Sequence, residues 1–421
     1  MTSSLFTFAH IIAALLLTLL LAHGGRRVAH RLRQPDVIGE ISAGLLAGPL
    51  LLALVGHNTF DFLLPGHILE ALKLLGQGAL ALYLVGLAHH LRSSARRPGK
   101  GAMAWVAIGS LVPSLLAGAL LAWWITAYAH PAVRGNAPLA AFVLMTAVSL
   151  SISAVPVMAR ILAARKMQDT PSGALTMAAA VLIDSAGWIL LTLALCLNAR
   201  TAQGLIHCLI ALALGGVFMI ILRGVLRSRA AQWLLRRRQV MVVFLAVAAC
   251  GMGYAMEHLG MTSILGAALV GFAVPSGART PWAPVVDTVS KTGRFLVPVF
   301  FVVTGVSVLS RSYGAASWSL LLLTLALGVI GKILGGYAGT RLAGQSPVVA
   351  REVGVLMNTR GLTELIVLQA GVSAGILTGP MTLSLVVMAL ATTAMTGPLL
   401  SYLERRRTAD DTPPVTVAAF S

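Results

Sequence analysis

Hydrophobic stretches of about 18 to 25 residues follow one another along the whole chain, separated by short polar or basic segments. Lipid offers no hydrogen-bond partners, so a segment that crosses it must be helical to satisfy its own backbone groups. The pattern predicts an all-α membrane protein with about 13 transmembrane helices. We place them at residues 4–23, 37–55, 68–90, 101–126, 136–163, 172–195, 204–222, 238–257, 262–276, 293–310, 317–340, 353–376 and 380–402.

The connections between these spans are short, so residues 1–410 are expected to form one transmembrane domain. Residues 411–421 are expected to form a short cytoplasmic tail, because a segment of this length cannot fold alone. The first apolar stretch lacks the basic start and the small-residue cleavage site of a signal peptide. It is therefore expected to remain in the protein as a transmembrane span. The composition agrees with a membrane protein, since 57% of the residues are hydrophobic and only 10% are charged.

The formal net charge of +18 raises the question of a nucleic-acid partner. The positions of the basic residues argue against it, because they gather on one side of the predicted spans, while Arg134, Arg200 and Arg311 fall on the other. This asymmetry is the positive-inside rule, and it predicts an outer N-terminus and a cytoplasmic C-terminus. The basic clusters lie at 26–33, 92–100, 160–166, 223–238, 279–294 and 405–407.

Two predicted spans carry helix-breaking residues at their centres. The fifth contains the segment from Ser149 to Pro156, and the twelfth contains Asn358 to Gly361. A membrane tolerates such breaks only where protein or a polar cavity receives the freed backbone groups. Each broken span is the middle member of a triplet, and the two triplets run in opposite directions, as in an inverted repeat whose interrupted helices meet at a binding site.

An ionisable side chain at the centre of a bilayer is costly, so each one is a candidate functional residue. Asp184 lies in the middle of the sixth span and can bind a proton or a cation in turn. An oxygen shell from Ser151, Ser153, Ser185 and Thr359 suits a hard monovalent cation, and we expect no other metal and no cofactor. The alternative is a buried structural acid that is hydrogen-bonded to serines.

Four further charged residues fall within predicted spans. Lys332 either braces the carbonyl ends of the interrupted helices or takes part in proton coupling. Arg360 and Glu364 lie four residues apart, the spacing of an intrahelical ion pair that neutralises both charges. Glu40 is either a gate residue or an acid that packs between helices.

Several motifs, in this order along the chain, resemble the Kef-type branch of the monovalent cation:proton antiporter superfamily, part of the sodium/hydrogen exchanger family. The motifs are Gln34 to Glu40, Ser151 to Leu162, Leu296 to Gly305, Gly331-Lys332 and Met357 to Leu365. The resemblance implies a homodimer in a bacterial cytoplasmic membrane. It further implies a core, made of spans within 101–195 and 317–402, that moves like an elevator against a dimerisation part made of the other spans. The ion-binding aspartate of the family corresponds to Asp184 and its core lysine to Lys332.

The chain departs from the family pattern where Ile183 replaces an acid or polar residue before Asp184, and where Ala88-His89-His90 replaces an acidic motif. With one titrating carboxylate, we predict electroneutral exchange of Na⁺ or K⁺ for a proton. The alternatives are a gated cation channel, a Kef-type efflux subunit, or a member with another substrate. An intramembrane enzyme is disfavoured, because the sequence shows no paired acids, His-rich metal motif or Ser/His pair at one depth.

Overall fold

The computed structural model describes residues 2–32, 34, 36, 38–44, 46–47, 65–93, 99–259, 261, 263–275, 281–309 and 316–410, and within these ranges every regular element is helical. This confirms the predicted all-α membrane class. The helices are α1 (Thr2–Arg31), α3 (Gly66–Ser93), α4 (Lys100–Tyr128), α5 (Pro131–Arg134), α6 (Leu139–Ser151), α7 (Val155–Ala164), α8 (Pro171–Ala199), α9 (Gln203–Arg227), α10 (Arg229–Leu234), α11 (Arg238–His258), α12 (Ser263–Ala273), α13 (Ala283–Leu309), α14 (Trp318–Leu342), α15 (Pro347–Met357), α16 (Leu362–Ser373) and α17 (Gly379–Asp410).

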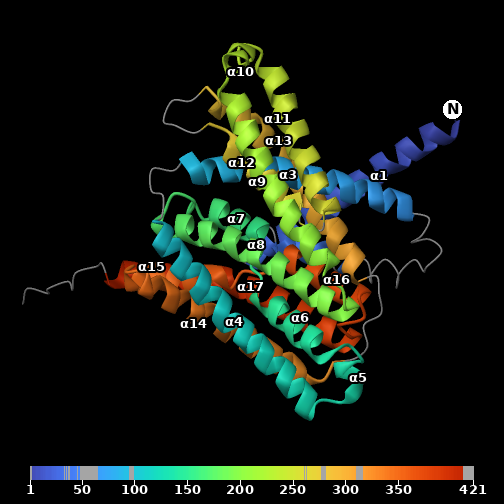
Figure 1. Ribbon diagram of the computed structural model, residues 1–421, viewed down its shortest axis with the longest axis vertical. Helices are drawn as coiled ribbons and strands as arrows, with labels where there is room; N and C mark the ends of the chain where they lie inside the picture. The colour runs from blue at the N-terminus through green and yellow to red at the C-terminus, as the bar shows by residue number, and fades with distance from the viewer. Residues whose placement is uncertain are drawn as a thin grey trace, which may run out of the picture.

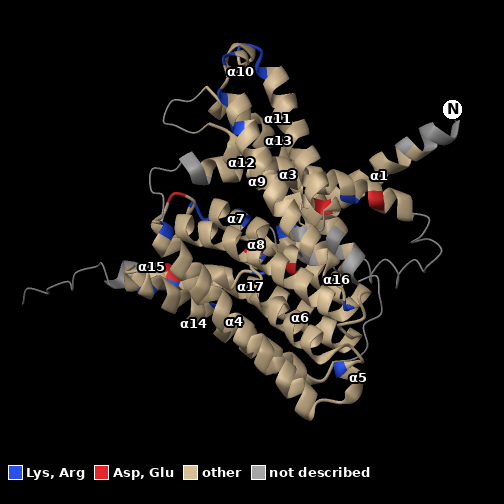
Figure 2. Ribbon diagram, in the orientation of Figure 1, with Lys and Arg blue, Asp and Glu red and all other residues tan. Residues whose placement is uncertain are grey.

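Nine stretches among the described residues are long and apolar enough to cross a membrane as helices. The shorter helices α12 and α16 fall within the predicted spans 262–276 and 353–376. The predicted span 37–55 and the tail 411–421 lie largely or wholly outside the described residues. Charged residues gather at helix ends and connecting turns, while the helical body is mostly free of them (Figure 2).

Helix α13 begins at Ala283, well before the predicted start of its span at residue 293. The early turns contain Asp287 and Lys291, whose side chains pair at 2.7 Å one turn apart. This pair stabilises a helix in water, whereas the hydrophobic pattern detects only the segment that lies in lipid. The charged start of α13 was therefore missed.

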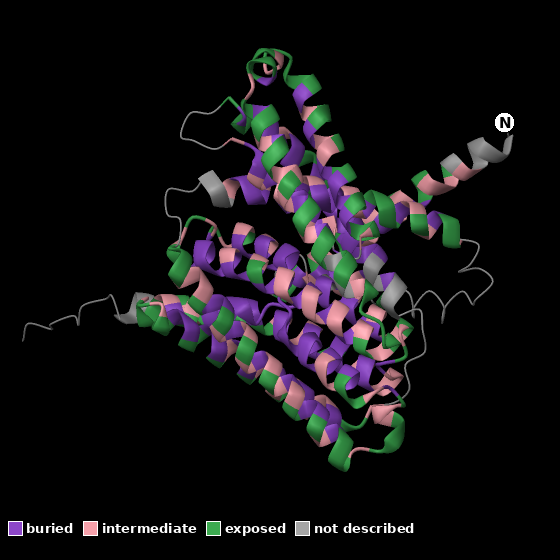
Figure 3. Cartoon of the chain, viewed as in Figure 1, coloured by how far each residue is buried: buried purple, intermediate pink, exposed green. Residues whose placement is uncertain are grey.

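Both predicted interruptions are confirmed. Helix α6 ends at Ser151 and α7 begins at Val155, with Pro156 in its first turn, where a proline is tolerated. Helix α15 ends at Met357 and α16 begins after Gly361. In the most apolar part of the stretch 139–164, 89% of the residues are buried, whereas the corresponding share for 209–227 is 22%. Protein therefore surrounds the first break (Figure 3). That burial is what permits an unwound backbone at membrane depth.

The helices pack in two groups, which occupy different parts of the molecule in Figure 1. In the first group α4 packs along α14 and α6, α6 and α7 along α8, and α14 along α15 and α17. In the second group α3 packs along α13 and α12, α12 along α11 and α9, and α13 along α1. Contacts between the groups include those of α3 with α7 and α8, and of α8 with α9. A dimerisation role for the second group stays a prediction.

A glycine seam joins α4 to α14 in the first group. A methyl group built on Gly109 would lie 2.5 Å from Cα of Gly339, and one on Gly335 would lie 2.3 Å from the carbonyl oxygen of Gly109. These distances are shorter than any real contact, so the two backbones are in direct contact. Small residues at such crossings allow close helix packing in membranes.

We expect Gly109→Ala to separate α4 from α14 and to lower the free energy of unfolding by about 1–3 kcal/mol. The measurement is the thermal midpoint of the purified protein in detergent. The matched control is Gly101→Ala in the same helix, where the added methyl group meets no described atom within 4 Å and removes backbone entropy from the unfolded chain. Equal midpoints for the two variants would contradict the packing argument.

Candidate ion-binding site at the crossing of two interrupted helices

The two unwound segments touch each other and are held by α17. The amide of Ala154 donates to the carbonyl of Thr359 across 3.3 Å. Thr393 of α17 accepts from the amide of Arg360 at 2.9 Å and donates to its carbonyl at 2.7 Å. The side chain of Asn358 donates to the carbonyl of Thr392 at 3.2 Å. Thr393 therefore satisfies the backbone amide and carbonyl of Arg360 in the second break, and Thr392 holds the side chain of Asn358.

Three threonines at this crossing were not among the site residues predicted from the sequence. Thr392, Thr393 and Thr396 stand within the apolar run of the last span, and a cluster of hydroxyls at that depth is the signal that could have revealed them. All three side chains are buried.

Two buried cations cap the carbonyl end of α6. The guanidinium of Arg360 donates to the carbonyls of Ser149 at 3.1 Å and Leu150 at 2.6 Å. The ammonium of Lys332 donates to the carbonyl of Ser151 and, at 2.8 Å, to the hydroxyl of Ser153. The C-terminal end of a helix carries partial negative charge, so both cations are favourably placed. Lys332 makes the contacts of the bracing alternative, and its part in proton coupling stays a prediction.

Glu364 lies in the first turn of α16, 3.6 Å from Arg360 in the unwound segment before it. Both side chains are fully or almost fully buried. Neither carboxylate oxygen of Glu364 has a hydrogen-bond partner among the described residues. Glu364 therefore supplies a counter-charge to Arg360, while the carbonyls of α6 and Gly328 fix the direction of the guanidinium.

Asp184 lies on α8 and is only 4% exposed. Its Oδ1 has no hydrogen-bond partner within the described part of the chain. One turn further on, a methyl group built on Gly187 would lie 2.8 Å from the side chain of Ile152, in the first unwound segment. A rise of about 1.5 Å per residue places Asp184 within one helical turn of that contact. The carboxylate is thus buried beside the break.

Asp184 also borders a small, mostly apolar cavity at the boundary between the two helix groups. Ser185 and Val155 line the same cavity from the first group. Helices α3 and α12 of the second group supply apolar side chains to the opposite wall, among them Leu84 and Ala268. The candidate carboxylate therefore faces the surface along which the two groups meet.

The other predicted oxygen ligands make contacts of their own in this structure. Ser153 accepts from Lys332, Ser151 and Ser185 each donate to a carbonyl in their own helix, and Thr359 donates to Thr396 at 3.4 Å. Ser185 shares the cavity with Asp184, whereas Ser151, Ser153 and Thr359 lie at the helix crossing. A complete oxygen shell around Asp184 stays a prediction.

Glu40 links the two helix groups. Its carboxylate, fully buried, accepts from Arg160 of α7 at 2.8 Å and lies 3.8 Å from Arg26 of α1. The backbone around Glu40 belongs with α1 and α13, since Gly39 packs on Gly25 and Gly44 packs on Val302. This geometry shows an acid packed between helices, and a gating role stays a prediction.

We expect Arg360→Lys to destabilise the protein by about 2 kcal/mol or more, because an ammonium cannot reach three carbonyls in the fork geometry of a guanidinium and buried carbonyls would lose their donors. The thermal midpoint in detergent measures this loss. Arg341→Lys is the control, since Arg341 bonds a single carbonyl, that of Gln345, at an exposed position. An Arg360→Lys midpoint equal to that of the control would show that the capping contacts contribute little.

Comparisons with known proteins support one family. Residues 12–403 match the family described as sodium/hydrogen exchanger, transmembrane. The chain is 33% identical over 401 residues to cation/H⁺ antiporter 18 of Arabidopsis thaliana, covering 93% of this chain and 48% of that protein. It is 30% identical over 383 residues to the Na⁺/H⁺ antiporter NhaS4 of Synechocystis, covering 88% of this chain and 91% of the relative. The chain thus spans about half the length of the plant relatives it matches.

A solved structure has the same fold. The sodium proton antiporter MjNhaP1 of Methanocaldococcus jannaschii, at pH 8, superposes with a TM-score of 0.53 over 95% of this chain and 97% of that one, at 15% identity. The likeness agrees with the two interrupted helices and the helical packing described above. The protein therefore belongs to the transmembrane sodium/hydrogen exchanger family.

Proposed function

We propose that the protein exchanges a monovalent cation, Na⁺ or K⁺, for protons, and that Asp184 binds both in turn. The observation that carries the proposal is the buried carboxylate of Asp184, which has an oxygen without a hydrogen-bond partner in the described structure and lies beside an interrupted helix. A buried carboxylate that forms no ion pair with a described residue is unfavourable when it is ionised, so a proton or a cation stabilises it. Relatives named as Na⁺/H⁺, K⁺/H⁺ and cation/H⁺ antiporters support the same chemistry.

The capping cations shape this site. Because Arg360 and Lys332 donate to the last carbonyls of α6, a cation bound at those carbonyls would lie beside two cationic side chains that repel it. The ligands left near Asp184 are its own carboxylate and the Ser185 hydroxyl, which keeps lone pairs while donating to the Val181 carbonyl. Oxygen atoms of this kind suit a hard cation such as Na⁺ or K⁺.

We further propose how the helices move, associate and are oriented in the membrane. The core made of spans within 101–195 and 317–402 moves against the remaining helices, which form a homodimer. The apolar side chains that α3 and α12 present to Asp184 favour this, since they make no polar bonds that movement would break. The excess of basic residues on one side of the spans supports an outer N-terminus and a cytoplasmic C-terminus. The membrane that we propose is a bacterial cytoplasmic membrane. A gated channel is the second candidate, and a dependence of cation flux on a proton counter-gradient distinguishes a carrier from it.

We expect Asp184→Asn to reduce cation-dependent proton movement in proteoliposomes to the level of protein-free liposomes, because a neutral amide cannot exchange a proton for a cation. The folded yield in detergent should remain close to that of the parent protein. Asp169→Asn is the matched control, since its carboxylate is 77% exposed and lies in the turn before α8. Exchange at the parental rate in Asp184→Asn would remove the central proposal.

We expect the exchange to be electroneutral, since Ile183 occupies the place of a second acid and one carboxylate carries one cation or one proton. A net charge moved per cycle would be worth about 2.3 kcal/mol per 100 mV, which is roughly a fifty-fold change in the equilibrium gradient. The measurement is cation-driven proton movement with the voltage clamped by an ionophore for an ion the protein does not carry. A rate that scales with voltage would rule out the single-carboxylate cycle, and Ile183→Asp would then show whether a second acid adds voltage dependence.

A further inference from the structure

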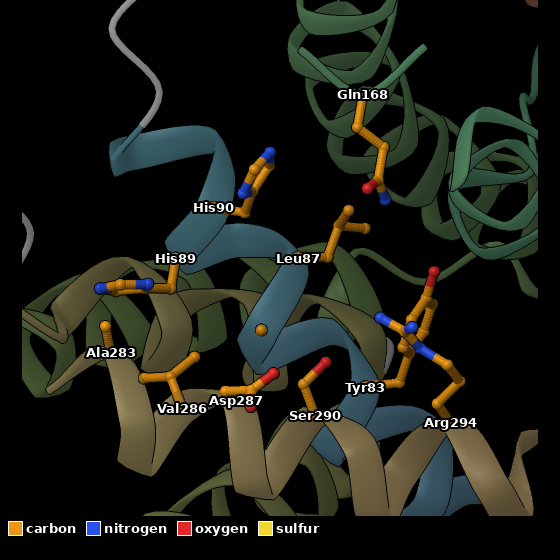
Figure 4. Close-up of a pocket in the computed structure, with 11 residues that line it drawn as sticks. Tyr83, Leu87, His89, His90, Gln168, Ala283, Val286, Asp287, Ser290 and Arg294 are labelled. Carbon is orange, nitrogen blue, oxygen red and sulfur yellow. The ribbon is translucent and has the colours of Figure 1, made fainter. Parts of the chain in front are cut away.

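A polar cavity opens between the end of α3, the start of α13 and the turn between α7 and α8 (Figure 4). Polar and charged side chains, which interact well with water and ions, line part of its walls. Gln168 extends into it from the α7–α8 turn. These three chain segments are the ones that the basic clusters place on the cytoplasmic side. The polar lining residues on α3 and α13 are Tyr83, His89, His90, Asp287, Ser290 and Arg294.

The polar cavity and the apolar cavity beside Asp184 share one lining residue, Leu87 of α3. Leu87 is 8% exposed, and Figure 4 shows its side chain projecting from α3 on the side of Gln168. One turn of α3 to either side of Leu87, each residue lines one cavity: His90 lines the polar cavity and Leu84 lines the apolar cavity. Leu87 is thus the residue common to the walls of the polar cavity and of the apolar cavity that borders Asp184.

The backbone beside Leu87 is fixed. A methyl group built on the neighbouring Gly86 would lie 2.3 Å from the side chain of Ser290 on α13, so α3 and α13 are in close contact there. The position of Leu87 therefore depends on packing within the second helix group. An apolar side chain at this point blocks a partly dehydrated ion, because it offers no oxygen to replace lost water.

We propose that the polar cavity is the vestibule through which ions and water reach Asp184, and that Leu87 is the gate residue that closes it in this structure. This rests on the proposed role of Asp184 as the ion-binding carboxylate. Leu87 lines the access route and does not bind the ion, which is bound by Asp184. Opening requires that Leu87 and the first helix group move apart, which is the kind of movement proposed above for transport.

The test measures access to the Asp184 cavity directly, without a transport readout. In a protein whose Cys196, Cys208 and Cys250 are replaced by serine, Ser185→Cys places a thiol in the apolar cavity, next to Asp184. Silver ions, which are monovalent and bind thiols, are added to one side of sealed vesicles. The remaining free thiol is then measured with a fluorescent maleimide after denaturation.

We expect slow thiol loss with Leu87 present, and an increase of roughly tenfold or more with Leu87→Ala when silver is added on the side of the polar cavity, because removing the plug lowers the barrier. Leu84→Ala is the matched control, since it enlarges the same apolar cavity without reaching the polar one. Ser290→Cys, at the wall of the polar cavity, should react at one rate whichever residue stands at 87.

Leu87→Val provides a milder change if the alanine variant fails to fold, and it should give an intermediate rate. Four results would overturn the gate: fast thiol loss with Leu87 intact, equal acceleration by Leu84→Ala, acceleration only from the opposite side, or no acceleration by either Leu87 variant. Because thiol access does not depend on transport, failure of the gate and failure of the proposed exchange are separate outcomes. Exchange is therefore measured in the parent protein, which keeps Ser185: a thiol gated by Leu87, together with no cation-dependent proton movement in the parent protein, would leave the access route standing and remove only the exchange.

Discussion

The capping of the α6 carbonyl end by Arg360 and Lys332 is the contact on which the rest of the site depends. A helix that stops in the middle of a membrane exposes carbonyls that lipid cannot satisfy. Two cations from distant helices close this end, one from the second interruption and one from α14. The same contacts tie the two interrupted helices to each other, so the crossing is a single polar unit inside an apolar body.

The burial of these cations has a second consequence. Arg360 has Glu364 as its counter-charge, whereas Lys332 donates to neutral oxygens of Ser110, Ser151 and Ser153. The dipole of the α6 end thus contributes to the stabilisation of the lysine. This arrangement fits the presence of Ile183, which is fully buried beside Asp184 and cannot supply a charge.

The boundary between the helix groups has two kinds of contact. Around Asp184 it is apolar, with side chains from α3 and α12 that make no directional bonds. Elsewhere it holds the buried pair of Glu40 with Arg160 and the exposed pair of His90 with Asp169 at 3.0 Å. Separating a buried pair leaves charge without a partner, which costs several kcal/mol, so Glu40 and Arg160 resist relative movement of the groups. An exposed pair contributes far less, since water replaces its partner.

The sequence by itself determined the membrane class, most of the spans, both interruptions and the candidate carboxylate. These follow from local rules: the length of apolar runs, the helix-breaking residues within them, and the rarity of an ionised group such as Asp184 in lipid. It also identified Lys332 and the spacing of Arg360 and Glu364. The charged start of α13 was not predicted from the sequence, because a hydropathy pattern does not detect a helix that is stabilised in water by an i,i+4 ion pair.

Only the tertiary structure decided which groups meet. The sequence offered Ser151, Ser153 and Thr359 as ligands of an ion, but spatial packing gives the Ser153 hydroxyl to Lys332 and joins Thr359 to α17. It likewise decided that Glu40 faces Arg160, and that Leu87 lies between two cavities. The reason is that partners far apart in the chain are selected by the geometry of helix crossings, here set by glycine contacts such as Gly109 with Gly339, and no local pattern encodes that geometry.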